Sequence, residues 1–158
     1  MVINARQEMF LKAMSFYGLK EIPGEEDNPQ ILEFFNDIGH EWVKDDETSW
    51  CSAFINYLAL KAGLERTGKL TARSWLKVGV PVNDPVIGQD IVVFWRVKPD
   101  GWQGHIGFYA GQDDDHIFTL GGNQSNMVCI KPYKKYQFLE YRRLQSVRGS
   151  GRYNLPKD

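Results

Sequence analysis

The chain has 158 residues, of which 42% are apolar and 25% are charged, and its formal net charge is −1 at pH 7. That length suits one domain, over residues 1–158, that buries about two thirds of the surface of its unfolded chain. A net charge so close to zero excludes strong long-range attraction to nucleic acid or anionic lipid.

Apolar residues before residue 80 recur with helical spacing. A first helix, which Gly18 would end, presents one apolar face made of Phe10, Ala13, Met14 and Tyr17. A second lies within 25–39, where Asp27 or Asn28 can cap the helix and Pro29 suits its first position. Its buried stripe is expected to contain Ile31, Leu32, Phe35 and Ile38.

A third helix is predicted from about Thr48 to Ala62, where Gly63 stops it. Thr48 or Ser49 is the expected N-cap, which would place Cys51 in the first turn. One side of this helix carries Phe54, Tyr57, Leu58 and Lys61. A short further turn of helix is expected within 71–79.

The second half of the chain has the alternation and the turn residues typical of strands. Five strands are predicted, at 90–97, 104–111, 116–122, 127–133 and 138–144. Helices followed by a meander of antiparallel strands indicate an α+β fold.

The first residues lack the unbroken apolar segment of a signal peptide, and no run approaches the roughly 18 apolar residues of a membrane helix. We therefore expect synthesis in the cytoplasm without a signal peptide and no membrane insertion. The net charge near zero leads us to expect no nucleic-acid partner. Basic residues from Lys131 to Arg152 are expected on a solvated edge strand and tail, and contact with an anionic polymer is the alternative.

Cys51 is one of two cysteines and is a candidate nucleophile. Free N–H groups and the dipole at a helix N-terminus favour an anion, so this position is expected to lower the pKa of the Cys51 thiol. The alternative is a buried structural cysteine, because free cysteine is among the most buried residue types. Cys129 lies inside a strand and is expected to be structural.

A nucleophilic cysteine needs a base, and the chain has three histidines. His40 at a helix end and His116 in a hairpin turn are expected to be exposed, whereas His105 opens a strand that can face the cysteine helix. Asn123 stands at the end of the next strand, where its side-chain oxygen can orient the ring of His105. The alternative is that Asn123 is a turn residue in a left-handed conformation.

These candidates belong to motifs that occur in a fixed order: "GLKEIPGEEDNPQILEFF", "DDETSWCSAFINYLALKAG", "ARSWLKVG", "GQDIVVFWR", "GHIGFYAG" and "LGGNQSNMVCI". The ordered set resembles the NlpC/P60 and CHAP superfamily of papain-like cysteine peptidases and amidases. It looks closest to a subgroup of small single-domain bacterial and phage proteins with a "WCSAF" helix and a "LGGNQ" strand end. The resemblance covers about residues 15–144 and leaves 145–158 as a C-terminal tail.

The resemblance implies N-terminal helices packed on a five- to six-stranded antiparallel sheet. It also implies catalysis by Cys51, His105 and Asn123, carried over by position. Many relatives have His, Glu or Asp as the third residue, and Gly121 stands where CHAP relatives often carry Glu. The implied reaction is cleavage of an amide in bacterial peptidoglycan, by an N-acetylmuramoyl-L-alanine amidase or an endopeptidase.

In the expected mechanism, His105 takes the proton of Cys51, and the Cys51 backbone N–H donates to the oxyanion with help from Asp46 or Ser49. Proximity to the motifs suggests four groove residues: Trp50, Trp95, Trp102 and Gln124. No metal or cofactor is expected, because the cysteines and histidines lack paired short spacings and no glycine-rich phosphate loop is present.

Two other functions remain open: a non-catalytic domain that binds the cell wall or a protein, and a thiol hydrolase that acts on another amide. We expect a monomer that reaches peptidoglycan by holin-type release, as a phage endolysin, or through a secretion system, as an effector. An effector would also bind an immunity or chaperone protein.

Overall fold

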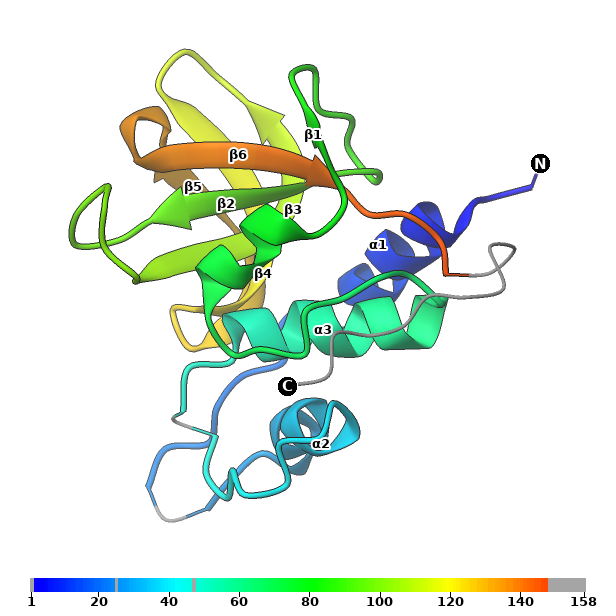
Figure 1. Cartoon of the computed structure of the whole chain (residues 1–158). Coiled ribbons are helices and arrows are strands. Elements are labelled where there is room, and N and C mark those ends of the chain that lie inside the picture. The colour runs from blue at the N-terminus through cyan, green and yellow to red at the C-terminus, as the bar shows by residue number, and fades with distance from the viewer. Residues whose placement is uncertain (1, 25, 47, 148–158) are drawn as a thin grey trace.

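Three α-helices and a six-stranded antiparallel sheet make up the computed structural model, which describes residues 2–24, 26–46 and 48–147 (Figure 1). α1 and α3 pack on the sheet, and α2 packs on α3. The predicted α+β fold, with helices before the sheet, is confirmed.

The first helix, α1 (Ala5–Ser15), begins at a capping box formed by Asn4 and Gln7. Its buried residues are Met9 and Ala13, whereas Met14 is 38% exposed. The predicted apolar face is therefore wrong by part of a turn, because the core on this side is reached by Met9 rather than by Met14.

The second helix, α2 (Pro29–Asp37), begins as predicted, with the Asn28 side chain accepting from the Gln30 N–H and Pro29 in the first turn. The stripe that it buries contains Ile31, Phe34 and Phe35, with Ile38 just beyond its end. Phe34 was not predicted, and it takes the place expected for Leu32, which is only half-buried.

The third helix, α3 (Cys51–Ala62), is buried along almost its whole length. Its N-cap is Trp50, which makes no side-chain capping bond, so the predicted caps Thr48 and Ser49 are wrong. Gly63 ends the helix in a left-handed conformation, as predicted. Cys51 is thus the first helical residue, where backbone N–H groups have no partner within the helix.

The sheet has the order β1-β6-β2-β3-β4-β5. Its strands are β1 (Val80–Val82), β2 (Ile91–Trp95), β3 (Gly104–Gln112), β4 (His116–Gln124), β5 (Met127–Lys134) and β6 (Phe138–Arg143). The predicted turn of helix is the 3₁₀ helix Ala72–Lys77, and a second one spans Lys135–Gln137. β1 was missed because it has only three residues, one of them proline.

The main core lies between the helices and the sheet, where Trp50 packs against Phe34 and Phe54. A smaller cluster on the opposite side of the strands contains Val92, Phe94, Tyr109, Ile117 and Tyr141. β2 and β3 thus have buried residues on both faces. The start of β3 is held from both sides, and His105 lies there.

Candidate active site

Cys51 lies at the junction of α3 and the sheet, and it is only 5% exposed. The thiol is in contact with the backbone N–H of Ile106, the residue that follows His105, and with the Ser49 hydroxyl. These contacts and the charge of Arg96 lower the pKa of the thiol, but burial has the larger effect and raises the pKa above its ordinary value. The expected lowering of this pKa is therefore wrong, since the cost of desolvating a thiolate exceeds the help of the helix terminus.

His105 is 3% exposed, and its ring stacks on Tyr133 with ring centroids 4.8 Å apart. Burial, with a smaller effect from the positive charges of Arg96 and Lys131, lowers the pKa of His105 to about 4, although the hydrogen bond with Gln124 acts in the opposite direction. At neutral pH the imidazole is uncharged and can accept a proton.

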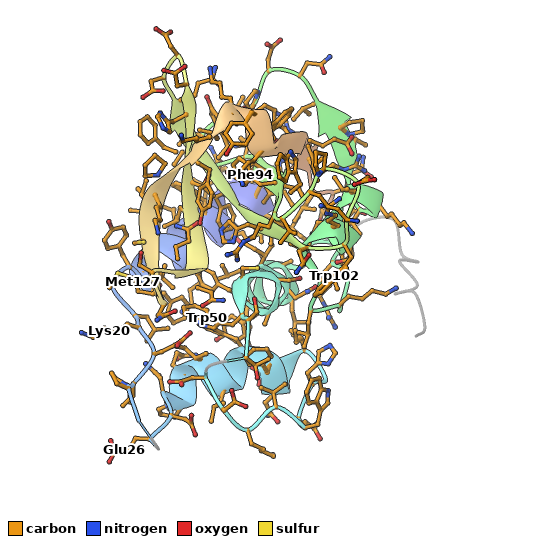
Figure 2. The ribbon with its side chains drawn as sticks, turned by 90° about the vertical axis from the view of Figure 1, so that its left-hand side faces the viewer. Lys20, Glu26, Trp50, Phe94, Trp102 and Met127 are labelled. Atoms are coloured by element: carbon orange, nitrogen blue, oxygen red, sulfur yellow. The ribbon has the colours of Figure 1, made fainter. Side chains whose placement is uncertain are left out.

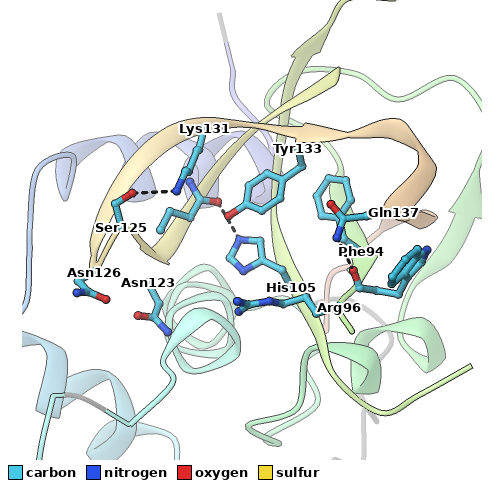
Figure 3. A pocket seen from close by; sticks show the side chains of 11 residues that line it. Phe94, Arg96, His105, Asn123, Ser125, Asn126, Lys131, Tyr133 and Gln137 are labelled. Atoms are coloured by element: carbon cyan, nitrogen blue, oxygen red, sulfur yellow. Dashed lines mark hydrogen bonds between the residues drawn. The ribbon is translucent and has the colours of Figure 1, made fainter. Parts of the chain in front are cut away.

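Gln124 fixes which ring nitrogen carries the proton. The Gln124 side-chain N–H₂ donates to two backbone carbonyls, Thr119 at 3.0 Å and Cys129 at 2.7 Å. Its oxygen must then face His105, and it lies 2.8 Å from Nε2 (Figure 3). Because an amide oxygen only accepts, Nε2 carries the hydrogen and Nδ1 is the free acceptor. The imidazole is thus prepared to take a proton at Nδ1.

The partner predicted for His105 was Asn123, and this prediction is wrong. Pairing of Phe108 with Leu120, continued regularly, would place Asn123 opposite His105. However, Asn123 has φ 59°, and the register between β4 and β5 shifts in this stretch. The side chain of Asn123 consequently turns to the Ser49 hydroxyl, 3.3 Å away, and Gln124 turns inward to His105.

Two glycines before this bulge allow the close approach of other side chains. A Cβ on Gly121 would lie 2.5 Å from the Gln124 oxygen and 3.3 Å from His105 Nε2. A Cβ on Gly122 would lie 2.6 Å from the Trp50 ring. The "GG" of the "LGGNQ" motif therefore makes room for the hydrogen bond on one side and for the core on the other.

Trp50 was predicted to line a groove, but it is fully buried, and its indole N–H donates to Glu21 at 2.8 Å. Figure 2 shows it in the interior, between the sheet and α2. A tryptophan next to a reactive cysteine need not face substrate, because successive residues at a helix start point in different directions. The prediction is wrong for this reason.

Asp46 was predicted as a possible oxyanion partner, but its carboxylate accepts from the backbone N–H groups of Ile22 and Asn28 at 2.9 and 2.8 Å. Such a group supplies no hydrogen to an oxyanion, and it orders the segment before α3 instead. Of the predicted pair, only Ser49 contacts the thiol.

Two hollows flank the Cys51–His105 pair. The histidine hollow has a volume of about 470 Å³, and its lining includes His105, Trp95, Arg96, Lys131 and Tyr133. The cysteine hollow has about 340 Å³, and Cys51, Ser49, Thr71 and Trp102 line it together with Arg96. Arg96 is common to both and stands at their boundary.

Of the predicted groove residues, Trp95 and Trp102 thus each line a hollow, and Gln124 also borders the histidine hollow while it orients His105. Sequence reasoning missed Arg96 and Tyr133 as site residues. Arg96 was predicted inside the strand 90–97, but β2 ends at Trp95, and the pattern of the strand gave no sign that Arg96 reaches the site. Tyr133 was missed because it lies among basic residues in the edge strand β5, where a solvent-exposed position was expected.

Within the described residues, no group of three or more histidine, cysteine, aspartate or glutamate side chains is arranged to hold a metal ion. Across the same part of the chain, every helix is too short or too polar to span a bilayer.

A scan against protein-family models and a search of curated proteins both give no match. Among solved structures, the fold is similar to the crystal structure of an NlpC/P60 family protein from Bacillus cereus, with a TM-score of 0.54 and 18% sequence identity over 87% of this chain. The chain spans 39% of the length of that protein. The comparison supports the fold: helices and a six-stranded antiparallel sheet arranged as in an NlpC/P60 protein.

Proposed function

We propose that this protein is a cysteine hydrolase that cleaves an amide bond of bacterial peptidoglycan. One observation carries the chemical part of the proposal. Gln124 holds His105 in the tautomer whose free nitrogen is Nδ1. The next residue of the same strand, Ile106, contacts the Cys51 thiol through its backbone N–H. This is the arrangement of nucleophile, base and orienting group that acyl transfer to a thiol requires.

The reaction would begin from two neutral groups, because burial raises the pKa of Cys51 and lowers that of His105. As the sulfur attacks the amide carbonyl, the thiol proton passes to Nδ1 of His105. The imidazolium then protonates the leaving amine as the carbon–nitrogen bond breaks. A water molecule, deprotonated by His105, hydrolyses the thioester and returns the thiol.

The oxyanion of the tetrahedral intermediate would be held by the Cys51 backbone N–H, which is free at the first position of α3. The Ser49 hydroxyl is a second donor beside the thiol. Asn123 donates to the Ser49 oxygen, which directs the hydroxyl hydrogen away from Asn123. Asn123 therefore acts on the site through Ser49.

Peptidoglycan as substrate rests on the ordered sequence motifs and on the likeness to an NlpC/P60 protein. An N-acetylmuramoyl-L-alanine amidase and an endopeptidase would use the same residues. A monomeric phage endolysin, or an effector with an immunity or chaperone partner, would fit the same site.

Digestion of purified sacculi tests this function. The protein is expected to release fragments with new amino termini, identified by mass spectrometry, and Cys51→Ala is expected to release none. Cys129→Ser is the matched control, because it removes the second thiol but keeps a hydroxyl that can donate to the Gln124 carbonyl, as the Cys129 thiol does at 3.4 Å, and it should leave the products unchanged. Equal release by Cys51→Ala would refute the thiol mechanism. Binding of sacculi without any products would favour a non-catalytic wall-binding domain.

A further inference from the structure

The histidine hollow is positively charged and polar. Besides His105 and three aromatic residues, its lining consists of Arg96, Asn123, Gln124, Ser125, Asn126, Lys131 and Gln137. No aspartate or glutamate of the described chain lines it. Figure 3 shows Arg96 and Lys131 on different sides of His105.

The two cations of the hollow have no acidic partner within the described residues. Lys131 Nζ donates to the Ser125 hydroxyl at 2.9 Å, a neutral acceptor, and the Arg96 side chain makes no ion pair. Arg143, by contrast, is paired with Asp90 at 2.8 Å. Both charges also lower the pKa of His105. A lower pKa weakens a catalytic base, so these charges would be a disadvantage unless a negatively charged substrate offsets them.

The hollow lies on the side of the reaction where the amine departs. The sulfur of Cys51 keeps the acyl group, and the cysteine hollow is lined by Cys51 and not by His105. The leaving amine takes its proton from the imidazole, and the histidine hollow is lined by His105 and not by Cys51. The acyl component of the substrate therefore belongs to the cysteine hollow, and the amine component belongs to the histidine hollow.

We infer that the histidine hollow is the leaving-group subsite, and that it binds an amine component carrying a free carboxylate between Arg96 and Lys131. This inference rests on the proposed amide hydrolysis and adds the charge of the leaving group to it. A guanidinium offers a carboxylate two parallel N–H donors, and the lysine ammonium adds a point charge from the opposite side. Peptidoglycan stem peptides carry such carboxylates, and their amidated forms do not.

Binding to the Cys51→Ala protein tests this without turnover. The probes are a synthetic stem tetrapeptide with free carboxylates and the same peptide with every carboxylate converted to carboxamide, both measured by titration calorimetry. We expect the carboxylate form to bind about tenfold more tightly or better. Equal binding of the two peptides, or no binding of either, would overturn the inference.

Variants in the same background locate the effect. Lys131→Gln is expected to reduce the preference for the carboxylate peptide to about threefold or less, and Lys131→Glu to abolish it. Lys134→Gln is the matched control, because it removes the same charge from the same strand but borders a different hollow, with Asp114 and His116. A preference that survives Lys131→Gln combined with Arg96→Gln, or that falls equally with Lys134→Gln, would refute the subsite.

The two proposals fail separately. Wild-type protein that digests sacculi but binds both peptides equally would keep the hydrolase and reject the subsite. Protein that releases no fragment but prefers the carboxylate peptide through Lys131 would keep the anion subsite and reject the hydrolase.

Discussion

The two halves of the candidate site are built in different ways. Cys51 is placed by a buried helix and by contacts with Ser49 and Ile106, so its position follows from packing of α3 on the sheet. His105 is placed by the β4 bulge, which brings Gln124 rather than Asn123 to its ring. The comparison teaches that the nucleophile depends on the core, whereas the state of the base depends on one irregular stretch of backbone.

Among changes to the residues that surround Cys51 and His105, the largest effect is expected from Gln124→Leu, which removes the hydrogen bond to His105 but keeps the side-chain volume. We expect turnover of a wall substrate to fall about 100-fold, at the low end of a general acid–base contribution. The change also leaves two carbonyls without their donor, so the free energy of unfolding should fall by about 1–3 kcal/mol. Turnover per folded molecule, measured with a denaturation curve, separates the two effects. An unchanged rate would show that Gln124 does not orient the base.

Gly121→Ala should give a smaller loss through the same bond. The new Cβ would lie 2.5 Å from the Gln124 oxygen, and Gln124 is held by its other hydrogen bonds, so the contact with His105 must lengthen. We expect turnover to fall about tenfold. Because both changes act on one bond, Gly121→Ala in a Gln124→Leu background should cost almost nothing more. Additive losses would contradict the shared route.

The pH dependence follows from the pKa of His105, which is lowered to about 4 from an ordinary value near 6.5. The base is then neutral at pH 5, so kcat/KM should persist there and fall only as pH approaches about 4. Between pH 4 and pH 6.5, His105 binds a proton more readily in the unfolded chain than in the folded one. The contribution of neutral His105 to stability is therefore full above pH 6.5 and is lost as pH falls, by on the order of 3 kcal/mol.

The measurement is the difference in the free energy of unfolding between wild type and His105→Gln, which lacks the titrating group, as pH is lowered from 7 to 4. A difference that stays constant over this range would refute the lowered pKa. Activity that disappears near pH 6 would do the same for the catalytic form of His105.

The smallest effect is expected from Asn123→Ala. Asn123 contacts Ser49 rather than His105, so we expect turnover to fall only about threefold, and no further when Ser49→Ala is already present. The ratio of the Asn123 and Gln124 effects measures the difference between the two halves of the site directly. A loss from Asn123→Ala as large as that from Gln124→Leu would contradict the observed bulge.

Much of the fold could be predicted, because it depends on local signals: the Asn28 cap, the Gly63 stop and the alternation of the five longer strands. What failed required knowledge of the surroundings. Phe34 is buried because α3 covers it, and β1 exists because β6 pairs with it.

The site divides in the same way. Cys51 and His105 could be proposed from position in their elements, and the structure brings both to the start of β3. The orienting residue was displaced by one position, because regular antiparallel register favours Asn123, whereas the left-handed conformation that was only the alternative for this residue breaks that register. The sign of the Cys51 pKa shift failed because burial cannot be read from a helix start.

The contact of Gly122 with the Trp50 ring has a consequence for how this protein can change over time. The Trp50 indole fixes the distance between the start of α3 and the β4 bulge. Replacing it by a smaller ring would therefore change the position of His105 relative to Cys51. Substitutions that leave the fold intact at this point should still alter catalysis. Divergent versions of this protein are therefore expected to keep the Trp50 indole and Gly122 together.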